Sequence, residues 1–176
     1  MRRLLLTLLL GTALLCQAAS KNPPARHQLR LGWGDMLFET LAFYPAKFYT
    51  GHFFAEYRYS FTKVTSVGIQ SDLQGIFREG IRDYDLSLLP TVRFTFLDRE
   101  WVQLYAGMGA GLLFAFDSAR ALELAPVVNT TLLGVQVGKG PWSGALELGG
   151  MSALRNAQKV YMLGSRLVSV SVNYRW

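Results

Sequence analysis

The sequence predicts an all-β protein, an eight-stranded antiparallel up-and-down transmembrane β-barrel. Three observations lead to this prediction. From residue 27 onward, apolar and polar residues alternate with a period of two, which is typical of half-buried strands. Eight such segments follow one another, and closed antiparallel membrane barrels have an even number of strands. The connections between the segments alternate between short turns and longer loops.

The predicted strands differ in how regularly their residues alternate. Residues 85–96 are the clearest case, because Leu86 and Phe94 share the apolar face while Arg93 lies on the polar face. The sixth and seventh strands alternate less regularly. In chain order, the strands are predicted at residues 28–33, 52–61, 66–77, 85–96, 101–116, 127–138, 142–150 and 166–176.

The connections predict that the two ends of the barrel differ. Short turns join the second strand to the third, the fourth to the fifth and the sixth to the seventh. Outer-membrane barrels have short turns at one end and longer loops at the other. The first long connection also carries an apolar pattern that favours one or two helical turns. The turns lie around residues 62–63, 98–100 and 139–141, and the long connections cover residues 35–50, 78–83, 117–125 and 151–164.

Residues 1–18 have the three parts of a secretory signal peptide. Arg2 and Arg3 precede an apolar stretch of about 12 residues, and small residues up to Ala18 follow. A transmembrane helix needs about 20 apolar residues. Export followed by cleavage is therefore favoured over an uncleaved membrane anchor.

The rest of the chain reads as one domain. Residues 19–26 form a short N-terminal extension, and residues 27–176 form the barrel. Cys16 is the only cysteine and lies within the signal segment, so the mature chain has no disulfide. A lipoprotein acylated at Cys16 remains an alternative.

Alternation alone leaves two orientations of the barrel wall. In a soluble secreted barrel, the apolar face would enclose an apolar ligand, whereas in a membrane barrel it would contact lipid. The lipid-facing orientation is favoured because the longer strands exceed the about 9–11 residues that a bilayer crossing needs. Gly107, Gly109 and Gly111 on the polar face suit a narrow interior. Aromatic residues gather near the strand ends, as they do at membrane interfaces.

Eight charged residues of the predicted strands share the polar face, four acidic and four basic. Inside a barrel they can form the paired network that buried charges require. We expect this network to set the strand register, because a slip by one residue would turn the charges toward lipid. A proton or ion path is the alternative. The residues of the predicted network are Arg30, Glu56, Arg58, Asp72, Asp85, Arg93, Glu147 and Arg175.

The signal segment, the alternating strands, the short turns and the closing VSVSVNYRW resemble small bacterial outer-membrane barrels of the outer membrane protein X and A type. The hairpin VQVGKGPWSGALELG, before a strand ending in YRW, is most similar to uncharacterised barrels of Bacteroidetes. The resemblance covers residues 27–176 and implies a Gram-negative outer membrane, with contacts to membrane lipid and lipopolysaccharide. It also implies that Val172, Tyr174 and Trp176 form a C-terminal signal for the barrel-assembly machinery, with Trp176 in place of the more usual Phe.

Residues with catalytic chemistry are few. Outer-membrane enzymes that modify lipid A use a His and a Ser near the outer rim, where this chain offers His52 and Ser71. A Ser–His pair with a carboxylate can activate a hydroxyl, but no motif of either enzyme family surrounds these two residues. A non-enzymatic barrel is therefore predicted, with a lipid A-modifying enzyme as the alternative. A diffusion pore is disfavoured because side chains fill the interior of an eight-stranded barrel.

The remaining features predict a structural or surface-interaction role. We expect no metal and no cofactor, because no His pair or carboxylate cluster has ligand spacing. The formal charge of +6 falls to +4 (6 − 2) without Arg2 and Arg3, which is no indication of nucleic-acid binding. Ser118 lies in a DSA tripeptide that resembles a short O-glycosylation signal. A surface partner would bind through the outer loops.

Overall fold

A computed structural model of the chain describes residues 26–34, 49–78, 81–116, 122–155, 159–165 and 167–176. Among these residues, no helix is long and apolar enough to cross a membrane. The strands are β1 (His27–Gly34), β2 (Tyr49–Ser60), β3 (Thr65–Arg78), β4 (Ile81–Asp98), β5 (Val102–Phe116), β6 (Glu123–Val137), β7 (Trp142–Arg155), β8 (Lys159–Ser165) and β9 (Val168–Arg175).

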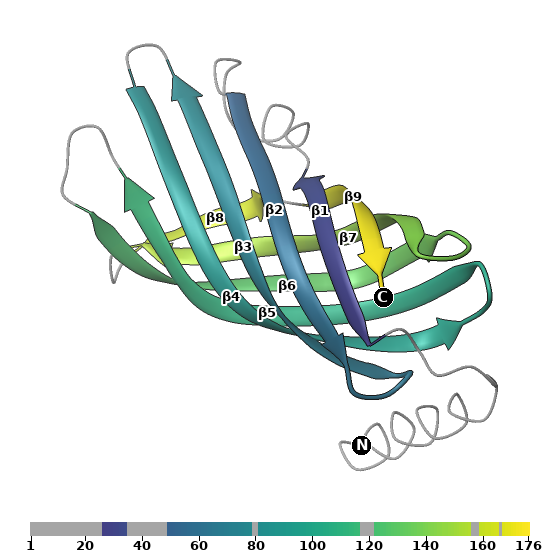
Figure 1. Ribbon diagram of the computed structural model, residues 1–176. Coiled ribbons are helices and arrows are strands. Elements are labelled where there is room, and N and C mark those ends of the chain that lie inside the picture. The colour runs from purple at the N-terminus through teal and green to yellow at the C-terminus, as the bar shows by residue number, and fades with distance from the viewer. Residues whose placement is uncertain (1–25, 35–48, 79–80, 117–121, 156–158, 166) are drawn as a thin grey trace.

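The strands form one closed antiparallel sheet (Figure 1). β1 to β6 pair in chain order, β6 pairs with β7, and β9 pairs with both β7 and β1, which closes the ring. β8 and β9 follow one another along the same edge of β7, so together they occupy one position in the ring. The predicted eight-stranded antiparallel up-and-down barrel is confirmed.

The three short turns, residues 61–64, 99–101 and 138–141, lie at one end of the barrel, which we call the turn end; the opposite end is the loop end. The first and last strands also meet at the turn end. The His27 N–H donates to the Trp176 carbonyl at 3.1 Å, and the Trp176 N–H donates to the His27 carbonyl at 3.0 Å. Gly140 in the last turn has a φ of 86°, a backbone conformation that glycine adopts without strain.

The strands extend further toward the loop end than the sequence predicts. β3 and β4 are separated by two residues only, and β8 occupies residues that were expected to form a loop. Antiparallel pairing uses backbone groups, so it continues through residues whose side chains do not alternate. The predicted signal peptide, the helical turns of the first connection and Ser118 lie outside the described residues.

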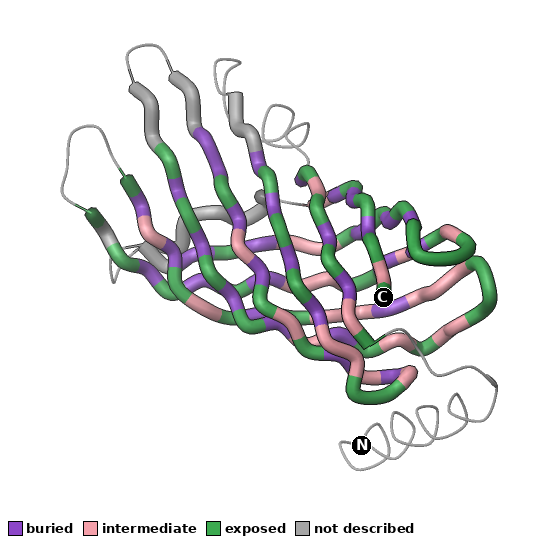
Figure 2. The backbone as a smooth tube through the Cα atoms, viewed as in Figure 1, coloured by how far each residue is buried: buried purple, intermediate pink, exposed green. Residues whose placement is uncertain are grey.

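Burial alternates along the strands wherever their side chains are described (Figure 2), and the polar face is the inner one. The alternative of a soluble barrel whose apolar face encloses a ligand does not agree with this arrangement. Outward-facing, exposed residues include Leu29, Leu31, Trp33, Phe53, Tyr57, Ile69, Leu86, Leu88, Phe94, Met108, Leu112, Val128, Leu146, Leu148, Val170 and Val172. Buried polar residues include Gln28, Arg30, His52, Glu56, Arg58, Gln70, Asp72, Asp85, Arg93, Asn129, Gln136, Glu147 and Asn173.

The interior also has an apolar part, which the sequence analysis missed. Seven buried apolar residues from β4, β5, β6 and β7 pack together in the loop-end half. They occupy the same strand face as the buried charges, so alternation alone does not separate them from a polar lining. The cluster consists of Leu89, Leu113, Ala115, Ala125, Val127, Met151 and Ala153.

A β-bulge in β6 explains why the alternation of the sixth strand is weak. The β6–β7 register shifts between Thr131 and Leu133, so the extra residue Leu132 and its neighbour Leu133 both face outward. The β4–β5 register shifts between Thr95 and Leu97 in the same way. A bulge adds one residue to one strand, which moves the following residues to the opposite phase of the alternation.

Candidate functional site

Five charged side chains form a continuous ion-pair network in the turn-end half of the interior. Glu56 on β2 pairs with Arg58 and, through its other oxygen, with Arg30 Nη1 at 3.4 Å. Arg30 Nη2 lies 2.6 Å from Glu147 Oε2 on β7, and Arg93 Nη2 on β4 lies 3.8 Å from Glu147 Oε1. The network therefore joins strands on different sides of the barrel.

Hydroxyl groups complete the environment of the two carboxylates. The Thr91 hydroxyl donates to Glu56 Oε1 at 2.6 Å. The Tyr105 and Ser169 hydroxyls donate to the two oxygens of Glu147 at 2.9 and 3.2 Å. Buried ion pairs offset their desolvation only when such additional hydrogen bonds are present.

The arginines of the network also contact aromatic rings and amides. The Arg93 guanidinium carbon lies 3.7 Å from the centre of the Tyr105 ring, a cation–π contact. Arg93 Nη1 also donates to Gln136 Oε1 at 3.3 Å. Gln136 Nε2 donates to the Ser143 hydroxyl at 2.8 Å, which extends the network toward the turn end.

Little space remains among these residues. The cavity that they line has a volume of about 10 Å³, and about 10–15 Å³ is needed to hold a single water molecule. At the height of the network, side chains fill the interior of the barrel. The charged groups therefore join strands to one another. This geometry favours the structural interpretation of the network over a water-filled ion path.

Gly134 provides the space for the Tyr105 ring. A Cβ atom at Gly134 would lie 2.1 Å from Tyr105 Cε2, so the ring packs directly on the backbone of β6. The ring is in turn held by Glu147 and Arg93. A side chain at position 134 would displace Tyr105 from both partners.

We expect Gly134→Ala to lower the free energy of unfolding by about 1–3 kcal/mol, as overpacking of a filled core does. Urea titration of the refolded barrel measures the change. Gly144→Ala is the matched control, because a Cβ there meets its nearest atom, Ser171 O, at 4.0 Å. Tyr105→Leu should remove most of the additional cost of Gly134→Ala. Equal losses at both glycines would contradict the expectation.

A second polar group lies in the loop-end half of the interior. His52 Nε2 on β2 contacts Asp72 Oδ1 on β3 at 2.8 Å, and Gln70 Nε2 donates to Asp72 Oδ2 at 2.6 Å. Strand register places Gln74 opposite both His52 and Asp85. All five side chains are buried. Among the described residues, no group of three or more His, Cys, Asp or Glu has the geometry to hold a metal ion.

The structure does not bring Ser71 and His52 together. Ser71 is opposite Ala55 and Leu88, which lie on the outer face, whereas His52 is buried inside with Asp72. Consecutive residues of a strand point to opposite faces. Because Asp72 points inward, the preceding residue Ser71 points outward. The hypothetical catalytic pair therefore lacks its nucleophile.

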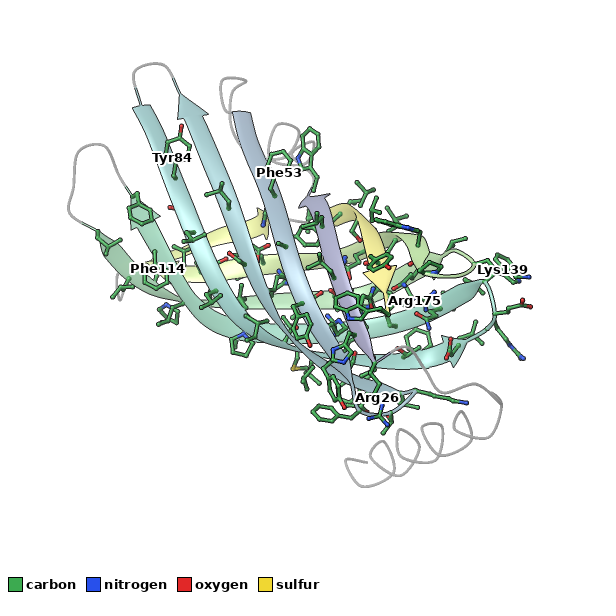
Figure 3. All side chains as sticks on the ribbon, viewed as in Figure 1. Arg26, Phe53, Tyr84, Phe114, Lys139 and Arg175 are labelled. Carbon is green, nitrogen blue, oxygen red and sulfur yellow. The ribbon has the colours of Figure 1, made fainter. Side chains whose placement is uncertain are left out.

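The other predicted residues lie near the turn end. Arg175 is partly buried close to the end of β9 (Figure 3). Val172, Tyr174 and Trp176 point outward, and the Trp176 ring stacks on Tyr174 and on His27, each with a centroid distance of 5.7 Å. Their role as an assembly signal stays a prediction.

Alternation showed which face carries charge, but gave no indication of the uncharged partners. The Tyr105 and Ser169 hydroxyls bind Glu147, and the Thr91 hydroxyl binds Glu56. Each lies at an inward position of its strand. Their inward position could have indicated these residues in the sequence, but other inward residues contact neither carboxylate.

The turns carry an exposed ion pair. Lys139 Nζ lies 2.7 Å from Glu100 Oε1, and both side chains are more than 70% exposed, at 76% and 73%. This hydrogen bond lowers the pKa of Glu100 and raises the pKa of Lys139 from their ordinary values. Such surface pairs contribute little to stability because water screens them.

No protein-family model matches the chain, and no curated protein matches it. Solved structures do match. The N-terminal β-barrel domain of Pseudomonas aeruginosa OprF has a TM-score of 0.59 and 7% identity, over 88% of this chain and 100% of that chain. The Yersinia pestis outer membrane protein Ail, in a phospholipid nanodisc, has a TM-score of 0.52 and 15% identity, over 86% and 99%.

Neisserial surface protein A (NspA) has a TM-score of 0.54 and 12% identity, over 85% of this chain and 96% of that chain. At such identities the similarity establishes the fold alone. The chain has the fold of small eight-stranded outer-membrane β-barrels.

Proposed function

We propose that this protein is an outer-membrane β-barrel of a Gram-negative bacterium with a structural or surface-interaction role and without enzymatic activity. The observation that carries the proposal is the combination of a continuous apolar outer belt with an interior blocked by ion pairs. The belt requires a lipid environment, and the blocked interior supports a scaffold rather than a channel.

The outer belt is far more apolar than the surface of a soluble protein. Trp33, Leu88, Met108, Leu146 and Val170 come from five different strands, and each is about half exposed, between 46% and 59%. Soluble monomers rarely expose contiguous apolar patches above a few hundred Å². In a bilayer the same residues contact acyl chains, while closure of the sheet pairs the backbone groups of neighbouring strands with one another.

The two ends of the barrel are proposed to contact different partners. The loop end would face the cell exterior, where loops on a rigid scaffold contact lipopolysaccharide or another surface partner. Export would require the signal peptide of residues 1–18, and insertion would use the barrel-assembly machinery acting on Val172, Tyr174 and Trp176. The resemblance of the sequence to barrels of Bacteroidetes supports a bacterium of that group as the source of the protein.

Expression of the full chain in a Gram-negative host tests the proposal. We expect the protein in the outer-membrane fraction, with a gel band that migrates faster unheated than boiled because the closed barrel resists detergent. A soluble periplasmic product without this shift would contradict the proposal. The same preparation, assayed for lipid A acylation or deacylation, separates the scaffold from the enzymatic alternative; His52→Ala is expected to leave the lipid A profile unchanged.

A further inference from the structure

The ion-pair network in the turn-end half carries one more positive charge than negative charge. Its cations are Arg30, Arg58 and Arg93 and its anions are Glu56 and Glu147, so its formal charge is +1 (3 − 2). All five side chains are at most 5% exposed. An unbalanced charge is costly in an interior that is shielded from water. We therefore expect a further negative charge close to the arginines.

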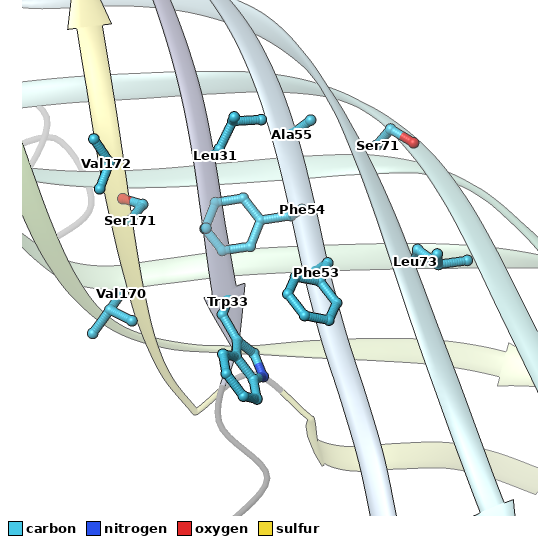
Figure 4. A pocket seen from close by; sticks show the side chains of 11 residues that line it. Leu31, Trp33, Phe53, Phe54, Ala55, Ser71, Leu73, Val170, Ser171 and Val172 are labelled. Carbon is cyan, nitrogen blue, oxygen red and sulfur yellow. The ribbon is translucent and has the colours of Figure 1, made fainter.

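A second group of acidic side chains, Asp72 and Asp85, lies in the loop-end half. Asp72 contacts His52, and Asp85 lies one row further toward the loop end. On β2, the buried Phe54 occupies the inward position between His52 and the network. Its ring extends over β1 (Figure 4), where it fills the space above Gly32. An aromatic ring therefore separates this acidic group from the arginines along β1 and β2.

Two of the arginines keep buried N–H groups that make no hydrogen bond to the described residues. Arg58 donates from Nη1 to the Ser66 hydroxyl at 3.2 Å and pairs through Nη2 with Glu56, but its Nε has no acceptor. Arg93 Nη2 also makes no hydrogen bond, and it lies 3.8 Å from Glu147 Oε1. A guanidinium group has donors only, so these N–H groups can be satisfied only by an acceptor. Buried donors in proteins nearly always have one.

All five charged side chains of the network line the same small cavity. Arg58 and Arg30 lie close enough to Arg93 to repel its charge, so a negative charge is stabilised in this cavity. Its volume of about 10 Å³ is close to the space of a single water molecule. This size excludes polyatomic anions such as sulfate. A chloride ion is only slightly larger than a water molecule, so it needs only small rotations of the flexible arginine side chains.

We propose that this cavity binds one monatomic, monovalent anion such as chloride, held by Arg58 Nε and Arg93 Nη2. The anion offsets the excess charge of the network and accepts hydrogen bonds from both unused donors. The inference goes beyond the proposed function, because it assigns a ligand to the interior of the barrel and does not depend on what the outer loops contact.

Urea unfolding of the refolded barrel in a zwitterionic detergent tests the site. Chloride is varied from about 1 to about 100 mM, and methanesulfonate, which is too large for the cavity, keeps the ionic strength constant. A ligand that binds only the folded state stabilises it by mass action, so a dissociation constant of about 10 mM raises the folding equilibrium constant about tenfold over this range. Broadening of the chloride NMR signal by the folded protein, lost on unfolding in urea, reports binding directly.

Two variants and one control assign the effect to the cavity. Arg58→Met and Arg93→Met each remove one cation and one unused donor, which leaves two arginines and two glutamates in the network. We expect the tenfold dependence on chloride to fall to about onefold in both. Lys139→Met is the matched control, because it removes a cation that is exposed in a turn; it should keep the full dependence. The gel shift on heating shows which samples are folded.

A wild-type barrel whose stability does not change with chloride, and whose folded form does not broaden the chloride signal, would overturn the proposal. A dependence of equal size in the wild type, in Arg58→Met and in Arg93→Met would also overturn it, because the effect would then come from charges outside the cavity. If neither arginine variant folds, the wild type and Lys139→Met decide. Broadening and a tenfold dependence in both support the site, and their absence in the wild type refutes it.

Discussion

Glu147→Leu is expected to lower the free energy of unfolding by about 3–5 kcal/mol, the usual cost of removing one partner from a buried ion pair. Glu147 contacts Arg30 and Arg93, and it accepts hydrogen bonds from Tyr105 and Ser169. Its loss leaves three buried arginines of the network facing the single carboxylate of Glu56. The uncompensated charge, rather than the lost contact itself, is the main cost.

The change is measured by urea unfolding in detergent or in vesicles, together with the temperature at which the gel shift is lost. Glu100→Gln is the matched control, because Glu100 also pairs with a cation but is exposed in a turn. We expect its effect to stay within about 0.5 kcal/mol, as for surface substitutions in general. Similar losses for the two variants would show that the interior network has no special role in stability.

A double substitution tests the mechanism. Arg30→Met together with Glu147→Leu removes a cation along with its partner, so it should cost less than Glu147→Leu alone, because apolar replacement of a whole buried pair is often neutral. A double variant that is less stable than the single one would mean that the arginine contributes mainly through other contacts. Its hydrogen bond to the Ser171 hydroxyl at 2.9 Å and its contact with the Phe54 ring are the candidates.

The same network shows what the sequence can predict about the interior. Alternation placed Arg30, Glu56 and Glu147 on one face, because a strand has only two faces and charge is excluded from the apolar one. Which charges meet depends on strand register and on the curvature of the ring. Arg30 is opposite Glu56 in the β1–β2 register, but it also reaches Glu147 on β7, past the intervening strand β9. A local sequence pattern does not show that these two residues, far apart along the chain, come into contact.

The limits of the pattern also have physical causes. The bulge at Leu132 changes the phase of the alternation within one strand, so a strict period of two misplaces part of β6. β8 forms on backbone pairing in a segment without regular alternation, which is why it was predicted as a loop. Ser71 was considered beside His52 because the two are close along neighbouring strands, but the pleat turns them to opposite faces.

Leu146→Arg is the second substitution with a large expected effect, about 2–4 kcal/mol of destabilisation in a lipid bilayer. Leu146 is the fifth residue of β7, so it falls near the middle of the about 9–11 residues that cross a bilayer from the turn end. It lies between Val135 and Val170 on the neighbouring strands, and its side chain is 46% exposed on the outer face. At mid-strand, an arginine cannot easily reach either membrane surface. Leu146→Ala is the control for lost packing, because it shortens the same side chain without adding charge.

The size of this effect depends on whether the outer face contacts water or lipid. The substitution therefore tests whether the barrel lies in a membrane. If the outer face contacts water, Leu146→Arg should change stability by about 0.5 kcal/mol or less and increase solubility. If it contacts lipid, unfolding from vesicles should show the full loss, and the variant should insert poorly. Refolding both variants into vesicles and measuring urea unfolding separates the two cases, because a loss confined to Leu146→Arg must come from burying a charge in hydrocarbon.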